Sequence, residues 1–234
     1  MTQLLNEFLS SSSAWGVLLT LAAFALGTLI NRVTGKAVFN PLLLGSIFVI
    51  ILLSVLNISY ADYKVSAAPV SYLLLPATIS LAIPLYEQIE PLKGNLKAIA
   101  AGIFTGVLTS LVCVLLLALL FGFNHQEYVT FLPKSITTAI GMGVSEELGG
   151  HVAVTVAVII ITGIMGNMLA EPVCRLFRIT EPVAKGIAIG SASHAIGTTK
   201  AMEMGQLEGA MSSLSIALSG VLTVFAAMLF SRFL

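Results

Sequence analysis

Long apolar runs dominate this chain and alternate with short polar stretches. A helix needs about 20 mostly apolar residues to cross the hydrocarbon core of a bilayer. Five runs approach or reach that length: residues 14–30, 41–56, 98–123, 152–170 and 210–230. The pattern therefore predicts a set of membrane-spanning helices and leaves little of the chain for a soluble part.

A sixth apolar run, residues 70–86, contains Pro76 and Pro84. Proline inside a helix removes a backbone hydrogen bond and clashes with the preceding turn. We therefore expect this run to be an interrupted span, with helix breaks at the two prolines.

Two further stretches, residues 133–150 and 186–209, are too polar for lipid-facing helices yet rich in Gly, Ala, Ser and Thr. Irregular backbone at membrane depth persists only where protein or a water-filled cavity satisfies its polar groups. We interpret both stretches as buried half-helices or re-entrant hairpins, with breaks at Pro133, Gly141, Gly143 and Gly190. Ordinary extramembrane loops are the alternative, and the pattern leaves open whether the two stretches cross fully or re-enter.

Composition agrees with a membrane protein. Hydrophobic residues make up 57% of the chain and charged residues 9%, whereas roughly a quarter of a soluble domain is charged. We expect an all-α polytopic membrane protein of about six to eight membrane segments, forming a single integral membrane domain over residues 1–234. Within it, N-terminal helices (14–123) precede a repeat pair (133–231). Each half of the pair is a short polar helix followed by a long apolar one, which predicts a repeat. We expect the two polar stretches to enter the membrane from opposite sides, which makes it an inverted repeat with two interrupted helices.

The first polar stretch carries a candidate anion site. Lys134 is followed closely by the hydroxyl residues Ser135, Thr137 and Thr138. Pro133 suits the first position of a helix, and the free N–H groups of a helix start favour an anion. The alternative for Lys134 is an interfacial lysine whose side chain reaches the headgroups.

The second polar stretch repeats the theme. Ser191 or Ser193 could cap a helix that begins near His194, and Gly197, Thr198 and Lys200 follow within two turns. His194 could bind a carboxylate or carry a proton near neutral pH; the alternative is a packed histidine bonded to a backbone carbonyl.

Carboxylates at membrane depth are costly and suggest function. Glu146 and Glu147 end the first stretch, and Glu203 and Glu208 lie in the second. We select Glu146 and Glu203, with His194, as candidates for proton or ion coupling and for pairing with Lys134 or Lys200.

Other classes of function are disfavoured. The sequence contains no hydrolase, metalloprotease or nucleotide-binding motif of the usual spacing, so we expect no enzyme. Its two cysteines and three histidines are scattered and its formal net charge is zero, so we expect no metal, no cofactor and no nucleic acid.

Several strings together resemble the LrgB/CidB antiholin-like family, which is related to plastid glycolate/glycerate translocators. The strings are LLLPATISLAIPLYEQ, LPKSITTAIGMGVSEELGG, IIITGIMGNML and AKGIAIGSASHAIGTTKAMEMGQLEGAMSSLSIALSGVLT. The resemblance extends over nearly the whole chain and is strongest at residues 73–223. It matches Pro133, Lys134, Ser135, Thr137 and Thr138 to one family motif, and Ser193, His194, Gly197, Thr198 and Glu203 to a second. Ala139 and Lys200 depart from it, standing where the family often has proline and arginine.

The resemblance implies a multi-pass protein of the bacterial cytoplasmic membrane. It further implies a small LrgA/CidA-type holin-like partner, control of murein hydrolase activity and cell lysis, and related proteins that carry small monocarboxylates. Our main hypothesis is an ion-coupled secondary transporter of a small monocarboxylate such as pyruvate, glycolate or lactate. The alternative is an antiholin-type regulatory subunit. We expect membrane lipid around the protein and a homo-oligomer, with a dimer as the working guess.

Overall fold

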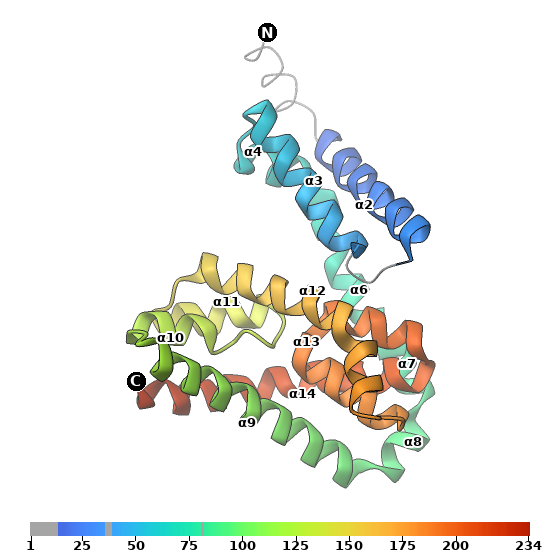
Figure 1. Ribbon diagram of the computed structural model, residues 1–234, viewed down its shortest axis with the longest axis vertical. Helices are drawn as coiled ribbons and strands as arrows, with labels where there is room; N and C mark the ends of the chain where they lie inside the picture. The colour runs from blue at the N-terminus through green and yellow to red at the C-terminus, as the bar shows by residue number, and fades with distance from the viewer. Residues whose placement is uncertain (1–13, 36–38, 81) are drawn as a thin grey trace. The chain divides into compact units, whose positions relative to one another are not determined.

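The computed structural model describes residues 14–35, 39–80 and 82–234. The chain forms two compact units, Met1–Ser80 and Leu81–Leu234, and the regular elements of the described residues are all helices (Figure 1). Four of these helices are long and apolar enough to cross a membrane: α2 (Trp15–Thr34), α9 (Leu96–Phe121), α12 (Val152–Leu176) and the segment Gln206–Phe233. The protein is therefore an all-helical membrane protein, as predicted.

The first unit is built on two packed helices, α2 and α3 (Pro41–Leu56). Asn40 caps α3 through its side-chain oxygen, which accepts hydrogen bonds from the amides of Leu42 and Leu43. Three short helices follow: α4 (Tyr60–Ser66), α5 (Ala68–Tyr72) and α6 (Leu74–Ser80). The predicted run 41–56 thus coincides with α3, which is shorter than a usual span.

The run 70–86 is interrupted, although not at the prolines themselves. Pro76 is the third residue of α6, and Pro84 is the third residue of α7 (Ala82–Glu87). The first turn of a helix tolerates proline because its amides have no partner in the helix. Pro76 therefore lies in the first turn of α6, and the expectation of a break at Pro76 is corrected by three residues, to the turn at Leu73. Residue 81, which separates α6 from α7, lies outside the described residues, so the expected break near Pro84 stays a prediction.

The second unit holds the remaining helices. After α7 come α8 (Ile89–Gly94), α9, α10 (His125–Phe131) and α11 (Thr138–Glu147). They are followed by α12, α13 (Pro182–Met204), α14 (Gln206–Phe230) and a short 3-10 helix, η2 (Ser231–Phe233). Helix α9 packs on α13 and α14, so it belongs with the C-terminal helices and not with the N-terminal group expected for residues 14–123.

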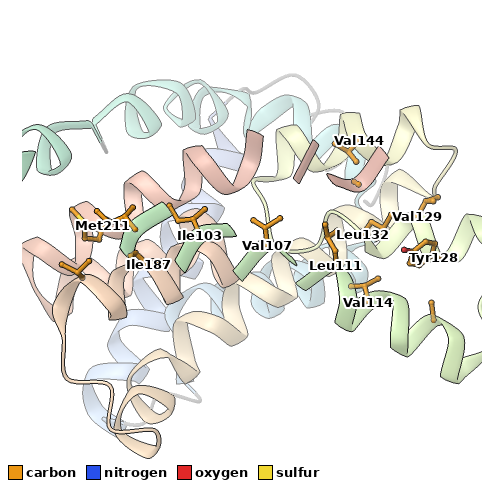
Figure 2. Close-up of a cluster of buried hydrophobic side chains, with 14 of the residues drawn as sticks. Ile103, Val107, Leu111, Val114, Tyr128, Val129, Leu132, Val144, Ile187 and Met211 are labelled. Atoms are coloured by element: carbon orange, nitrogen blue, oxygen red, sulfur yellow. The ribbon is translucent and has the colours of Figure 1, made fainter. Parts of the chain in front are cut away.

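The core of the second unit lies along one face of α9. Ile103, Val107, Leu111 and Val114 recur three or four residues apart and are buried against α10, α13 and α14 (Figure 2). Tyr128 of α10 is also fully buried, and its hydroxyl donates to the carbonyl of Phe230 at 3.0 Å. Outward-facing residues such as Phe104 and Leu120 remain exposed, as expected of a helix whose other face meets lipid.

Glycines let α13 lie close against α14. Gly186 and Gly190 are separated by one helical turn, the spacing of small residues that brings membrane helices together. A Cβ at Gly186 would lie 2.5 Å from the carbonyl oxygen of Glu208 and 2.6 Å from Cβ of Met211. The two backbones can keep this separation only because neither glycine has a side chain.

Candidate functional site

The turn before α11 presents the first group of predicted site residues. Helix α11 begins at Thr138, and Thr137 has extended backbone angles (φ −63°, ψ 146°). Pro133 therefore does not open a helix, and Gly141 and Gly143 lie inside α11 without breaking it. Within this turn the side chain of Ile136 is buried, with 1% exposure.

A buried hydroxyl network fixes the helices on both sides of this turn. Thr155 Oγ1 of α12 contacts the carbonyl of Thr130 at 2.9 Å and Oγ of Ser145 at 2.7 Å. Asn124 and Glu127 form a capping box that starts α10, satisfying two amides reciprocally. Since α10, α11 and α12 are tied together in this way, the turn between α10 and α11 is held at a defined place.

Lys134 is the basic residue of this turn. Its Nζ donates to Oγ of Ser135 at 2.9 Å, and that oxygen lies 3.1 Å from Oγ of Ser110. Ser110 is close to the middle of α9, so the ammonium lies near mid-length of a helix that is long enough to span. Lys134 is in a turn outside the four candidate spans, and burial lowers the pKa of its ammonium below the ordinary lysine value.

Lys134 and Ser135 line a cavity of about 670 Å³ between α9 and the first half of α13. On α9 the lining residues are small or hydroxylic, including Thr105, Gly106, Thr109 and Ser110. On α13 they include Ser191. A Cβ at Gly106 would lie 2.9 Å from Oγ of Ser191, so a larger residue there would push the two walls apart.

Helix α13 is broken at His194, where the backbone takes φ 43° and ψ −143°. This region is almost reserved for glycine. The ring of His194 is buried and its Nε2 donates to the carbonyl of Ile159 at 2.9 Å. A Cβ at Gly163 would lie 2.6 Å from Cε1 of His194, so the glycine makes room for the ring.

The break lies four residues after Gly190, which is itself helical, so the prediction of a break at Gly190 is wrong. Ser191 donates to the carbonyl of Ile187 and caps no new helix start.

The other predicted residues of the second stretch pack behind the cavity. Thr198 Oγ1 donates to the carbonyl of His194 at 3.0 Å and lies 2.7 Å from Oγ of Ser212. Ser193 is buried against Gly166 and Gly197. The residues that line the Lys134 cavity do not include six of the predicted site residues: Thr137, Thr138, Ser193, His194, Gly197 and Thr198.

Lys200 lies in a different cavity, 6 residues beyond the break. Its Nζ is 3.2 Å from Glu203 and 3.5 Å from Glu171, so the predicted pairing of Glu203 with Lys200 is present. Glu146 is exposed and forms no ion pair with another described residue. The predicted set is therefore divided among the Lys134 cavity, the packed region around His194, and the Lys200 cavity.

Comparison with known proteins assigns the family. The sequence model of the LrgB-like family matches residues 20–233. This chain belongs to the LrgB-like family. It is 34% identical over 221 residues to the protein named "Antiholin-like protein LrgB" of Bacillus mycoides (strain KBAB4), covering 94% of this chain and 96% of the relative. Proteins of the same name from Bacillus cereus (strain B4264) and Bacillus anthracis (strain CDC 684 / NRRL 3495) match to the same extent. No solved structure matches this chain.

Sequence reasoning missed part of the cavity of this LrgB-like protein. On α9, a helix otherwise rich in leucine and valine, the pair Thr105 and Gly106 is followed four residues later by the pair Thr109 and Ser110, which places all four on one side of the helix. Small and hydroxylic residues at helical spacing in an apolar run were the signal for these positions.

A buried ion pair was also missed. Glu208 is 8% exposed, and its Oε1 lies 3.8 Å from Nζ of Lys185. It is the most buried carboxylate of the described residues, whereas the selected Glu203 is largely exposed. The E-G-A string at Glu208, part of the family resemblance, was the available signal.

Proposed function

We propose that this LrgB-like protein has an antiholin-type role in the membrane and that its molecular activity is to bind and carry a small monocarboxylate. The first part is supported by the family and by the names of the Bacillus relatives, which favour the antiholin-type role more directly than transport. In that role the protein would act with a small LrgA/CidA-type holin-like partner and influence murein hydrolase activity.

The second part rests on one observation: a lysine ammonium lies in a cavity beside the middle of α9, among hydroxyl groups. An ammonium partly removed from water gains more from a carboxylate than a surface lysine does. Ser110 and Ser135 share one hydrogen bond, so the hydroxyl that accepts in this pair can donate its own proton to the same anion. The walls between these groups are apolar, which suits a short carbon chain.

The charge of the cavity indicates a single carboxylate. Among the described residues that line this cavity, Lys134 is the one basic residue and Glu181 is the one acidic residue. Glu181 is the N-cap of α13. Glu181 precedes Ser191 by ten residues, roughly 15 Å along the helix. One cation with uncharged donors balances one carboxylate, whereas a dicarboxylate would leave a buried charge without a partner.

We place the movement that accompanies transport, one repeat shifting against the other, at the break in α13 at His194. Secondary transporters place broken helices at the midplane of inverted repeats, and we assign α11–α12 and α13–α14 as the two repeats. His194 remains our candidate for proton coupling because it is buried at the break. Glu203 and Glu146 are weaker candidates because both are exposed.

Uptake of radiolabelled pyruvate or glycolate into proteoliposomes tests the carrier activity. Charge-assisted hydrogen bonds contribute about 1.5–3 kcal/mol, so we expect Lys134→Ala to reduce uptake roughly 10- to 100-fold. Lys97→Ala, the same change at an exposed lysine of α9, should leave uptake unchanged. Saturable uptake and counterflow that depend on Lys134 support carriage.

A different result separates the two parts of the proposal. Leakage of unrelated solutes without saturation would refute carriage and support a holin-like assembly. The antiholin-type role is tested independently, by measuring murein hydrolase activity and lysis in cells that lack or express the chain. Unchanged lysis would remove that role whatever the uptake experiment shows.

A further inference from the structure

A second cavity, of about 730 Å³, lies where α12 ends and α13 begins. Its described lining contains four basic residues, Arg175, Arg178, Lys185 and Lys200, and two acidic ones, Glu171 and Glu203. Helix α13 starts at Pro182 within this region, and a helix start favours negative charge. The end of α12, which favours positive charge, borders the same cavity, so the attraction for an anion comes from the excess of positive side chains.

Three of the four cations already face carboxylates. Arg175 donates to Glu171 at 2.6 Å, Lys200 lies between Glu171 and Glu203, and Lys185 faces Glu208 at 3.8 Å. Arg178 forms no ion pair with another described residue. The guanidinium of Arg178 is thus the group of this cavity left to bind an external anion.

The backbone at Arg178 has a conformation that favours glycine, which provides a substitution for testing its side chain. Arg178 takes a positive φ of 55° at the end of α12. The amide of Ile179 donates to the carbonyl of Cys174 at 2.8 Å, which is the helix-ending motif that usually places glycine at this position. An arginine occupies a conformation that glycine would adopt without strain, and its side chain borders the cavity.

The surroundings identify the kind of anion. Met165, Leu169, Val173 and Leu176 recur along one exposed face of α12 and lead toward Arg175 and Arg178. Phe177, beside Arg178 in the sequence, is 69% exposed. An apolar stripe on a spanning helix, ending at a basic cavity, matches a molecule with acyl chains and an anionic headgroup.

We propose that this cavity binds the phosphate headgroup of an anionic phospholipid, with the acyl chains lying along the exposed face of α12. Arg178 supplies the contact to the phosphate. The site is independent of the Lys134 cavity and of the carrier activity proposed above. Free phosphate shares the headgroup chemistry but makes no use of the apolar stripe.

Native mass spectrometry of the full-length protein in detergent, titrated with phosphatidylglycerol or phosphatidylcholine, tests the site. Arg178→Gly removes the guanidinium while placing the favoured residue at this backbone conformation, so the fold is expected to persist. Losing one basic contact to an anionic lipid corresponds to about five-fold weaker binding. Arg232→Ala removes the same charge from an exposed residue of η2. This control variant should bind phosphatidylglycerol with the affinity of the wild-type protein.

Alkylation of Cys174 locates the lipid, because this buried cysteine lines the cavity. In a Cys113→Ser background, phosphatidylglycerol should slow its reaction with a small thiol reagent, and Arg178→Gly should abolish that protection. Equal protection by phosphatidylcholine, equal protection by inorganic phosphate, or no protection by phosphatidylglycerol would each overturn the proposal. Unaltered phosphatidylglycerol binding by Arg178→Gly would do so as well.

Discussion

Replacing Gly190 by alanine tests whether the close approach of α13 and α14 holds the second unit together. The new Cβ would overlap the carbonyl oxygen of Ser212 and lie 2.8 Å from its Cα. Both atoms belong to the backbone of α14, so no rotamer change can relieve the contact. Ordinary contact begins at 3.4 Å, so the helices must separate by roughly 1 Å, beyond the range where dispersion contacts keep their full strength.

The expected loss follows from two opposing effects. Overpacking costs about 1–3 kcal/mol, and the upper part of that range applies because backbone atoms must move. Alanine in place of glycine stabilises a helix by about 1 kcal/mol. The net destabilisation is therefore about 1–2 kcal/mol, which lowers Tm by roughly 2–8 °C for a chain of this size.

The two cysteines of the chain provide the assay. Cys113 is exposed and Cys174 is buried in the second unit, so Cys113→Ser leaves one thiol whose slow reaction with a fluorogenic dye accelerates when this unit unfolds. The single tryptophan, Trp15, belongs to α2 of the first unit, so its fluorescence would not report on α13 and α14. All variants are compared at one heating rate because unfolding of membrane proteins in detergent is commonly irreversible.

Gly143→Ala is the matched control. Gly143 lies in α11, where a Cβ added to it would have no neighbouring atom within 4 Å. Its substitution by alanine therefore gains helix propensity without a clash and should keep or raise Tm. If Gly190→Ala melts at or above the temperature of Gly143→Ala, the argument from close backbone packing is refuted.

Three further predictions concern the residues around the two cavities. The free energy of unfolding of His194→Gly should be about 1–3 kcal/mol higher than that of His194→Ala, because both variants lose the ring but only glycine suits φ 43° and ψ −143°. Identical melting of the two variants in the Cys174 assay would contradict this. Thr155→Val should lower the free energy of unfolding by about 1–3 kcal/mol, because it removes hydrogen bonds inside the protein. Thr105→Val, which loses bonds only to its own helix turn, should cost less in the same assay. Burial lowers the pKa of Lys134, so anion binding should fall as pH rises through a value below 10.5, the ordinary lysine pKa. Lys134→Arg should keep binding in that alkaline range because guanidinium stays charged; matching pH profiles from equilibrium binding of labelled pyruvate would argue against Lys134 as the anion-binding group.

The long helices could be predicted from the sequence because lipid imposes one strong requirement on them. A span needs a continuous apolar run, and the runs at 98–123, 152–170 and 210–230 correspond to α9, α12 and α14 with ends shifted by a few residues. α12 extends to Leu176, past the predicted end at residue 170 and through Pro172. Hydropathy sets the apolar part of a helix, whereas its last turn is set by local hydrogen bonding.

The helix breaks could not be placed in this way. Several glycines in 186–209 permit a break, and the chain uses none of them for the break inside α13, which falls at a histidine. The position is decided by neighbours distant in sequence: Gly163 leaves space for the ring and Ile159 provides its hydrogen-bond acceptor. Lys200 also has a partner distant in sequence, Glu171 of α12, whose carboxylate lies 3.5 Å from its Nζ.

The first half of α13 is a wall common to both cavities. Ala184, Ala188 and Ser191 face the Lys134 cavity, while Lys185 faces the other and contacts Glu208 of α14. A substitution in this half-helix therefore changes both cavities together and cannot tell which of them binds the anion or the lipid. Lys134 and Arg178 lie outside α13, each lining one cavity only. If the two sites are separate, Lys134→Ala should leave phosphatidylglycerol binding intact, and Arg178→Gly should leave binding of the monocarboxylate intact in detergent solution, where no bilayer links the two measurements.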